Sequence, residues 1–446
     1  MFQYPIADLR QIAADTLKVG KHVGASAMVV EISENSGLNV SVRKQSIETI
    51  EQTRDKSLAV TVYLGKRLGH ASSADLSPQS IRETVEAAYQ IARFTAADPF
   101  AGLPSQASLA KEILDLDLYH PWDLSSAQAV KLALQTEAAA LAVSGEISNS
   151  DGASVSTGDG QFVLANSLGF NHGYPYSRHS VSCAPIAARN GDMQRDYWYA
   201  VDCQHRRLPH GAAIGDYAAR RTLARLGAKR LSTRQVPVLF EAPLASGLLG
   251  HLAQAAAGGA LYRQSSFLVD GLGKPLFAPH VSVYDKAHEA GNLGSAPFDG
   301  EGVRTRDRKI VDSGVLKGYF LSTYSARKLG MRTTGNAGGS HLMSFSSKLT
   351  RPDDDFEAML RKLGTGLLVT ELMGQGVNYV TGDYSRGASG YWVENGEIRH
   401  PVEEITIAST LPAMFAGIVA IGADVIQRGG KRTGSVLIER MSVAGT

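Results

Sequence analysis

The stretch GTGLLVTELMGQGVNYVTGDYSRGASGYWVENGEI, residues Gly364 to Ile398, decides the fold of the C-terminal half of this chain. Leu367 to Thr370 is a short apolar run, which is typical of a buried strand. The alternation along Val377–Thr381 predicts a half-buried strand. Asn395-Gly396 lies between two apolar runs and predicts a hairpin. We therefore expect this stretch to form a twisted sheet with tight turns.

The same stretch carries Glu371, Asp383 and Arg386 among glycines rather than on a helix face. Gln375 stands between two glycines, where the backbone must turn or must allow a close approach. Glu371 and Asp383 could act together as acid and base, although nothing in the sequence fixes the distance between them. Solvated charges on a twisted sheet would explain the same residues, and the residues taken alone favour that interpretation.

Length and charge narrow the classes of protein to which the chain can belong. With 446 residues it is long for a single hydrophobic core, so two domains are expected. Its 45 basic and 43 acidic residues give a formal net charge of +2, whereas a nucleic-acid-binding protein would carry a basic excess or stripe. No direct nucleic-acid partner is therefore expected.

The cysteines and the N-terminal stretch predict the compartment. Cys183 and Cys203 show neither metal-ligand spacing nor a disulfide framework, and we expect both to be free thiols in a reducing environment. The opening MFQYPIADLRQIAADTLKVG lacks the pattern of a signal peptide. No apolar run reaches the length of about 18 residues that a membrane helix needs. The sequence therefore predicts a cytoplasmic protein without membrane contact.

Periodicity and turn residues predict the elements along the chain. Ser125 and Gln128 have the spacing of a capping box ahead of a helix that runs to Val143. The first half is expected to hold short strands separated by turns at 35–37, 64–66, 151–152, 158–160, 168–169 and 190–191. The polar segment Arg230–Gln235 marks an expected domain boundary near residue 230. In the second half we expect helices at 243–257 and 356–363, strands at 236–240, 267–271 and 281–284, and a polar loop at 342–355.

The chain contains few motifs that are typical of a catalytic, metal-binding or anion-binding site. It has no HExxH zinc motif, no GxSxG nucleophile elbow and no P-loop. His251 lies alone on an apolar helix, where a packing role is expected rather than a metal-ligand role. Gly335–Gly339 could cradle an anion through backbone N–H groups, but a tight turn is the simpler interpretation.

Short motifs in a fixed order identify a resemblance over nearly the whole chain. They are SSADLSP (72–78), RHSVSC (178–183), NGDMQRDY (190–197), FDGEGVRT (298–305), SARKLG (325–330), TGNAGG (334–339), TELMGQGV (370–377), TGDYSRGASGYWVENGEI (381–398) and GSVL (434–437). With these motifs the chain resembles the TldD/PmbA family, and within it the PmbA (TldE) branch. The resemblance implies an α+β fold of two domains. These are a mixed α/β domain over residues 1–230 and a domain with a strongly bent, barrel-like sheet over residues 231–446.

The resemblance also implies a function, because the family is associated with a cytosolic zinc peptidase built from two related chains. It was also named for modulation of DNA gyrase. The TldD chain carries zinc through an HExxxH helix and a later Cys. Here the similar helix is SGLLGHLAQAAAGG, where Leu249, Gly250 and Gln254 take the places of the two ligands and the base, and no Cys follows Cys203. We therefore expect no zinc and no catalytic residue in this chain, and zinc in a TldD-type partner.

The site residues follow from that interpretation. Glu371, Gln375, Asp383 and Arg386 are expected to contact a peptide or the partner chain. The expected partners are a TldD-type chain and a peptide or unfolded protein, with a homodimer when the chain is alone. Two alternatives stay open: a metal-independent hydrolase that uses Glu371 and Asp383, and a non-enzymatic binding protein such as a gyrase modulator.

Overall fold

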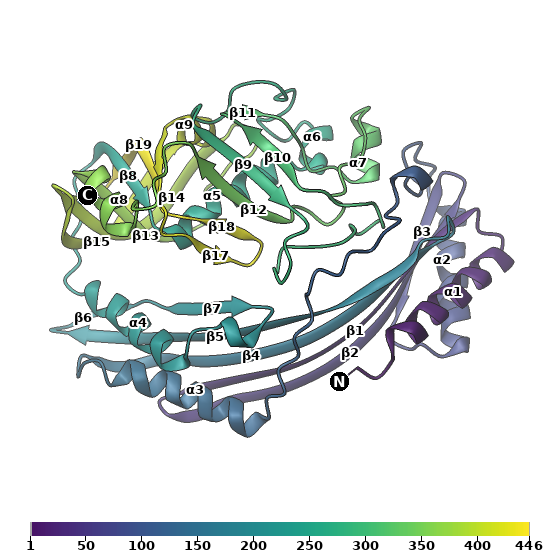
Figure 1. Cartoon of the computed structure of the whole chain (residues 1–446), viewed down its shortest axis with the longest axis horizontal. Coiled ribbons are helices and arrows are strands. Elements are labelled where there is room, and N and C mark those ends of the chain that lie inside the picture. Colours follow the sequence, from purple (N-terminus) through teal and green to yellow (C-terminus); the bar gives the residue numbers. More distant parts are fainter. Residues whose placement is uncertain (1, 446) are drawn as a thin grey trace.

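A long curved antiparallel sheet dominates the first half of the computed structural model, which describes residues 2–445 (Figure 1). Its strand order is β3-β2-β1-β4-β5-β6, and β7 pairs with β5. The strands are β1 (Ala27–Arg43), β2 (Ser46–Leu64), β3 (Arg67–Ser73), β4 (Ile147–Asn166), β5 (Asn171–Arg189), β6 (Asp192–Arg195) and β7 (Trp198–Asp202). The sheet sweeps beneath the rest of the molecule in Figure 1.

The strands of this sheet are longer than the turn residues predict. The expected turns at 35–37, 151–152 and 158–160 are wrong, because β1 and β4 continue through them, with a bulge in β4 at residues 151–152. Gly37 pairs with Thr53 of β2 on one side and Gly158 of β4 on the other. Here cross-strand pairing outweighs local turn preference, and glycines within a strand allow the sheet to bend. The expected turns at 64–66, 168–169 and 190–191 are confirmed.

Two pairs of helices cover one face of the sheet. They are α1 (Ile6–His22) with α2 (Pro78–Phe94), and α3 (Ser126–Leu141) with α4 (Gly211–Ala224). The predicted capping box of Ser125 and Gln128 begins α3. Alternate residues of β1 point to this face, so Met28, Val30 and Ile32 pack under the first pair and Leu38, Val40 and Val42 under the second. Between the pairs, the same face carries the polar residues Glu34 and Ser36.

The second half contains a closed barrel of five strands, as the resemblance implies. The strands follow the order β15-β14-β13-β8-β19, and the pairing of Ile407 with Val443 closes the ring. They are β8 (Arg234–Phe240), β13 (Gly366–Met373), β14 (Asp383–Glu394), β15 (Glu397–Thr410) and β19 (Val436–Ala444), with β16 (Ile418–Ile421) beside β19. The predicted Asn395-Gly396 turn joins β14 to β15. An α+β fold is therefore confirmed.

A second sheet and five helices complete this half. The sheet contains β9 (Val281–Lys286), β10 (Arg308–Asp312), β11 (Val315–Leu316), β12 (Leu342–Ser347), β17 (Ile426–Arg428) and β18 (Lys431–Thr433). The helices are α5 (Ala242–Ala255), α6 (Gly258–Tyr262), α7 (Thr323–Lys328), α8 (Phe356–Leu363) and α9 (Leu411–Ala416). The prediction for residues 356–363 matches α8, and α5 is displaced from its predicted limits by one or two residues.

Three local predictions in this half are wrong. Val377–Thr381 is a loop with one isolated bridge from Val377 to Tyr384, because its backbone bonds back onto the start of β14 instead of onto a neighbouring strand. The segment 267–271 forms turns, held by the hydroxyl of Ser266 rather than by a ladder. The supposed loop at 342–355 contains β12, whose polar side chains alternate with buried ones.

The two halves meet through charged side chains. Arg221 of α4 binds Glu241 ahead of α5, and Arg225 binds Glu371 of β13. On the face of the sheet turned away from the helices, Phe162 and Tyr174 pack against Phe298. The expected boundary near residue 230 falls between α4 and β8. Within residues 2–445, no helix has the length and apolarity to cross a membrane.

Candidate functional site

The helix α5 positions the first candidate site. Leu248, Leu249 and Leu252 anchor it in the core of the C-terminal half. Its other side, at Gly250 and Gln254, faces a pocket of about 500 Å³. The remaining lining comes from the segments that enclose the pocket: Ala253, Ala257–Gly259, Phe320, Ser322, Ser325, Asn336, Gly338–Ser340 and Lys431. These lining residues include no carboxylate.

A lysine lies against α5 in this pocket. A Cβ atom at position 250 would lie 3.1 Å from Nζ of Lys431, so Gly250 makes room for the ammonium group. Among the described residues, the Lys431 side chain has no ion-pair or hydrogen-bond partner. The pocket therefore presents a positive charge that no neighbouring carboxylate neutralises.

His251 lies on the adjacent side of α5, in the packing role that its apolar surroundings predict. Its Nδ1 is 2.9 Å from the hydroxyl of Tyr379, and its ring packs edge-on to Tyr384. Burial lowers the pKa of His251 to about 4, and the positive charges of Arg386 and Lys431 add to the shift. The imidazole is therefore neutral near pH 7.

The residues around α5 do not fit a zinc ion. A structural zinc site has four protein ligands and a catalytic site has three, drawn from Cys, His, Asp and Glu. Across residues 2–445, no group of three or more such side chains is arranged to hold a metal. The positive charges of Arg386 and Lys431 act on His251 instead, and like charges oppose the binding of a metal cation.

The predicted acid–base pair is not brought together. Glu371 accepts a hydrogen bond of 2.5 Å from Arg225 and so connects the two halves of the molecule. Glu371 lies on β13 opposite Ser389 of β14, and Ser389 is six residues along that strand from Asp383. Six residues of strand span on the order of 20 Å. Direct acid–base cooperation between Glu371 and Asp383 therefore has no geometric basis.

The other three predicted residues lie near one end of the barrel, where Asp383 and Arg386 point to opposite faces of β14. Gln375 is exposed in the loop between β13 and β14, Asp383 begins β14, and Arg386 follows it on the same strand. Backbone hydrogen bonds fix the loop, including one of 2.7 Å from Ser385 N to Gly376 O. A side chain at Gly376 would collide with this strand, which explains the glycine. Arg386 Nε is buried without a hydrogen-bond partner among the described residues.

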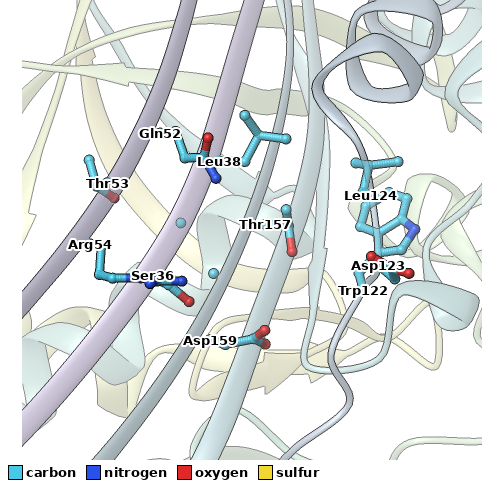
Figure 2. A pocket seen from close by; sticks show the side chains of 12 residues that line it. Ser36, Leu38, Gln52, Thr53, Arg54, Trp122, Asp123, Leu124, Thr157 and Asp159 are labelled. Carbon is cyan, nitrogen blue, oxygen red and sulfur yellow. The ribbon is translucent and has the colours of Figure 1, made fainter. Parts of the chain in front are cut away.

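Sequence reasoning missed a larger hollow on the helix-covered face of the curved sheet (Figure 2). Its volume is about 590 Å³, and its floor is formed by β1, β2 and β4 between the two helix pairs. The segment Trp122–Leu124 forms one wall, and Gln52, Thr53 and Arg54 of β2 line the opposite side. Residues from four distant segments line it, so no local motif could have revealed it.

Polar groups in the floor of this hollow are partly fixed and partly free. Thr157 lies 2.8 Å from Nδ1 of His179, whose Nε2 is 2.8 Å from the carbonyl oxygen of His120. Trp122 stacks on His205. Within the described residues, Oδ1 of Asp159 is buried and has no hydrogen-bond partner. A buried acceptor without a partner marks a place where a water or ligand group would be stabilised.

Comparison with known families identifies the PmbA/TldA metallopeptidase family along most of the chain. Models of the PmbA/TldA metallopeptidase match its domain 1 to residues 29–92, its central domain to 119–226 and its C-terminal domain to 233–445. Metalloprotease PmbA of Escherichia coli O157:H7 is 46% identical, over 96% of this chain and 94% of that protein. A PmbA homologue of Haemophilus influenzae is 44% identical, over 98% of this chain and 96% of the relative.

Solved structures share the fold. A Bacteroides thetaiotaomicron protein, named as a candidate modulator of DNA gyrase, superposes with a TM-score of 0.92 at 25% identity, and the match covers 98% of this chain and 99% of that one. TldE of Thermococcus kodakarensis superposes with a TM-score of 0.85 at 17% identity, over 97% of this chain and 100% of that one.

Proposed function

Because the chain belongs to the PmbA/TldD metallopeptidase family, we propose that it is the subunit without metal in a two-chain peptidase. A TldD-type chain supplies the zinc and the general base, and this chain helps to hold the peptide. The two unpaired, buried thiols of Cys183 and Cys203 suit a reducing compartment, and we place the complex in the cytoplasm.

The observation that carries this proposal is the placement of Lys431 against α5. When α5 is aligned with the zinc-binding HExxxH helix of a TldD-type chain, Gly250 takes the place of the general base. The ammonium group of Lys431 occupies the space beside Gly250. A cation at that place opposes metal binding and cannot activate water as a base. The chemistry must then come from another chain, as the family resemblance suggests.

The barrel end provides groups that suit contact with a peptide or with the partner chain. Gln375 and Asp383 are exposed, and Arg386 has one donor without a partner. Amide, carboxylate and guanidinium groups can bind peptide N–H and C=O groups with little dependence on sequence. Glu371 is less suited to this role, because Arg225 already occupies its carboxylate.

The test is a peptidase assay with an unstructured peptide. The purified chain is assayed alone, and then mixed with a TldD-type chain from the same organism. We expect cleavage in the mixture only, loss of cleavage with a chelator, and no zinc in this chain after dialysis. The variant Arg386→Ala should weaken pairing or peptide capture, while Arg399→Ala on the neighbouring strand serves as the control. Cleavage by this chain alone in the presence of chelator would show the proposal to be wrong.

A further inference from the structure

Helix α7 contributes side chains to two pockets. Ser325 lines the pocket beside α5, whereas Thr323 and Arg327 line a second pocket of about 550 Å³. The rest of the second pocket is formed by residues of three further segments: 105–108, 303–306 and 331–333. Its lining therefore combines parts of the chain that are far apart in sequence.

Four arginines line this second pocket, the arginine pocket, and none of its lining residues is a carboxylate. Arg327 donates hydrogen bonds of 2.5–3.0 Å to three backbone carbonyl oxygens in the segment 100–103. Arg304, Arg306 and Arg332 have no ion pair and no side-chain hydrogen bond with any other residue between 2 and 445. Like charges that share a pocket repel each other, and nothing in the lining neutralises these three.

The local chain path places two of these arginines on the same side. Val303 and Thr305 are each 3% exposed, whereas Arg304 and Arg306 are exposed, so burial alternates along the segment. The hydroxyl of Thr305 donates a hydrogen bond of 2.7 Å to the carbonyl oxygen of Ala296, which fixes the inward side. In an extended segment alternate side chains point the same way, so Arg304 and Arg306 share the outward side.

The lining also contains a hydroxyl that the rest of the protein does not use. Thr323 is 5% exposed, and its Oγ1 is buried without a hydrogen-bond partner among the described residues. Its backbone N–H donates a hydrogen bond of 2.8 Å to the carboxylate of Glu301, which is not a lining residue. Buried polar groups are normally paired, so this hydroxyl is a neutral donor that remains available to a bound group.

We propose that the arginine pocket binds the phosphate groups of a small molecule. Each guanidinium group can donate two parallel hydrogen bonds to an oxyanion. A phosphate group carries close to two negative charges near pH 7 and has three strong acceptor oxygens, whereas a carboxylate has one charge and two oxygens. Three unpaired cations therefore suit a phosphate or a pyrophosphate better than a single carboxylate.

The size and the composition of the pocket narrow the ligand further. A volume of about 550 Å³ lies within the usual range for small-molecule sites. No aromatic residue is present in its lining, so a nucleobase would find no ring on which to stack. We therefore expect recognition of the phosphate groups themselves, whether they belong to inorganic pyrophosphate or to a nucleotide. The proposal does not depend on the proposed peptidase function.

Titration calorimetry of the purified full chain at low salt tests the ligand class. We expect pyrophosphate to bind more tightly than inorganic phosphate, and phosphate more tightly than acetate. ADP should bind within about threefold of pyrophosphate, because it offers the same two phosphate groups. Absence of pyrophosphate binding, equal binding of acetate, or tighter binding of a short acidic peptide would overturn the proposal.

Two substitutions test the location. Arg304→Gln and Arg332→Gln should each raise the dissociation constant of pyrophosphate by about tenfold or more, because each removes a charge-assisted contact. Arg361→Gln on α8 is the matched control, since it removes an exposed arginine at the opposite end of the C-terminal half from α7 (Figure 1). Neither test variant breaks an ion pair, so thermal unfolding without ligand should match that of the unmodified chain. Unchanged affinity in both test variants, or an equal loss in Arg361→Gln, would overturn the proposed site.

Discussion

The barrel and the curved sheet differ in whether their strands leave an unpaired edge. In the barrel, β15 pairs with β19 and the ring closes, so neither strand is left as an edge. In the sheet, β2 keeps an unpaired edge from Ser46 to Ser57. A closed barrel satisfies its backbone hydrogen bonds internally, whereas an open sheet leaves the outward backbone groups of an edge strand unpaired. The comparison suggests that the closed barrel contributes more to stability than the open edge of the sheet.

The largest expected effect concerns the barrel core. Phe240 on β8 is 0% exposed, and Phe240→Ala should lower the free energy of unfolding by about 3–5 kcal/mol, because it removes buried contacts and leaves a cavity. Phe94→Ala is the matched control, since Phe94 is 84% exposed on α2, and should change stability by no more than about 0.5 kcal/mol. Urea denaturation measures both. Equal losses would contradict the assignment of stability to the barrel.

The pH dependence of stability probes α5 beside the barrel. Burial lowers the pKa of His251 to about 4 in the folded chain, below its unfolded value of about 6.5. Between these values the unfolded state binds more protons, so stability falls as the pH drops from about 6.5 to 4, by up to about 3 kcal/mol. His251→Gln should remove this part of the dependence. Denaturation curves of both proteins at pH 7 and pH 4.5 provide the measurement, and identical pH profiles would refute the role of His251.

The connection between barrel and sheet should show a smaller effect. Glu371→Gln removes the nearer charged partner of the Arg225 guanidinium, which is 11% exposed, and leaves it the carboxylate of Asp196 at 3.9 Å. We expect a loss of about 1–2 kcal/mol, less than for a fully buried pair because Glu371 is 31% exposed. Glu397→Gln removes the exposed partner of Arg399 and should cost less than about 0.5 kcal/mol. Thermal unfolding compares the two variants, and a neutral Glu371→Gln would show that the halves are held by other contacts.

The smallest effect concerns the thiols of the sheet. Burial raises the pKa of Cys183 to about 12 and that of Cys203 to about 11, so neither forms a reactive thiolate near pH 8. An alkylating reagent should leave both unmodified in the folded chain and should modify both after denaturation. Mass spectrometry reads the outcome. A linked pair of cysteine peptides from the cell would contradict the prediction of free thiols.

Local signals predicted the parts of the fold that depend on neighbours in the sequence. The capping box of Ser125 and Gln128, helix α8 and the Asn395-Gly396 hairpin are present where they were predicted. Each rests on contacts within a few residues, so a single sequence contains the information. The strand expected at Val377–Thr381 failed, because alternation alone does not supply a neighbouring strand.

The candidate site was predicted less well than the fold. Gln375, Asp383 and Arg386 lie at one end of the barrel, but their role in binding stays a prediction. Glu371 has a structural partner in Arg225, which is distant in sequence and therefore could not be foreseen. The hollow of Figure 2 was also unforeseeable, since its lining combines β1, β2, β4 and the segment Trp122–Leu124.

By itself, the sequence determined the family, the α+β class and the helices that have their own caps, since these depend on local order. The sequence also showed Leu249 and Gln254 at the places expected for the two zinc ligands, and Gly250 at the place expected for the base. Only the tertiary structure decided that β1 and β4 run unbroken through their glycines, that β15 closes on β19, and that Lys431 lies against α5. The physical reason is that these features depend on contacts between residues tens to hundreds of positions apart, which the folded chain alone brings together.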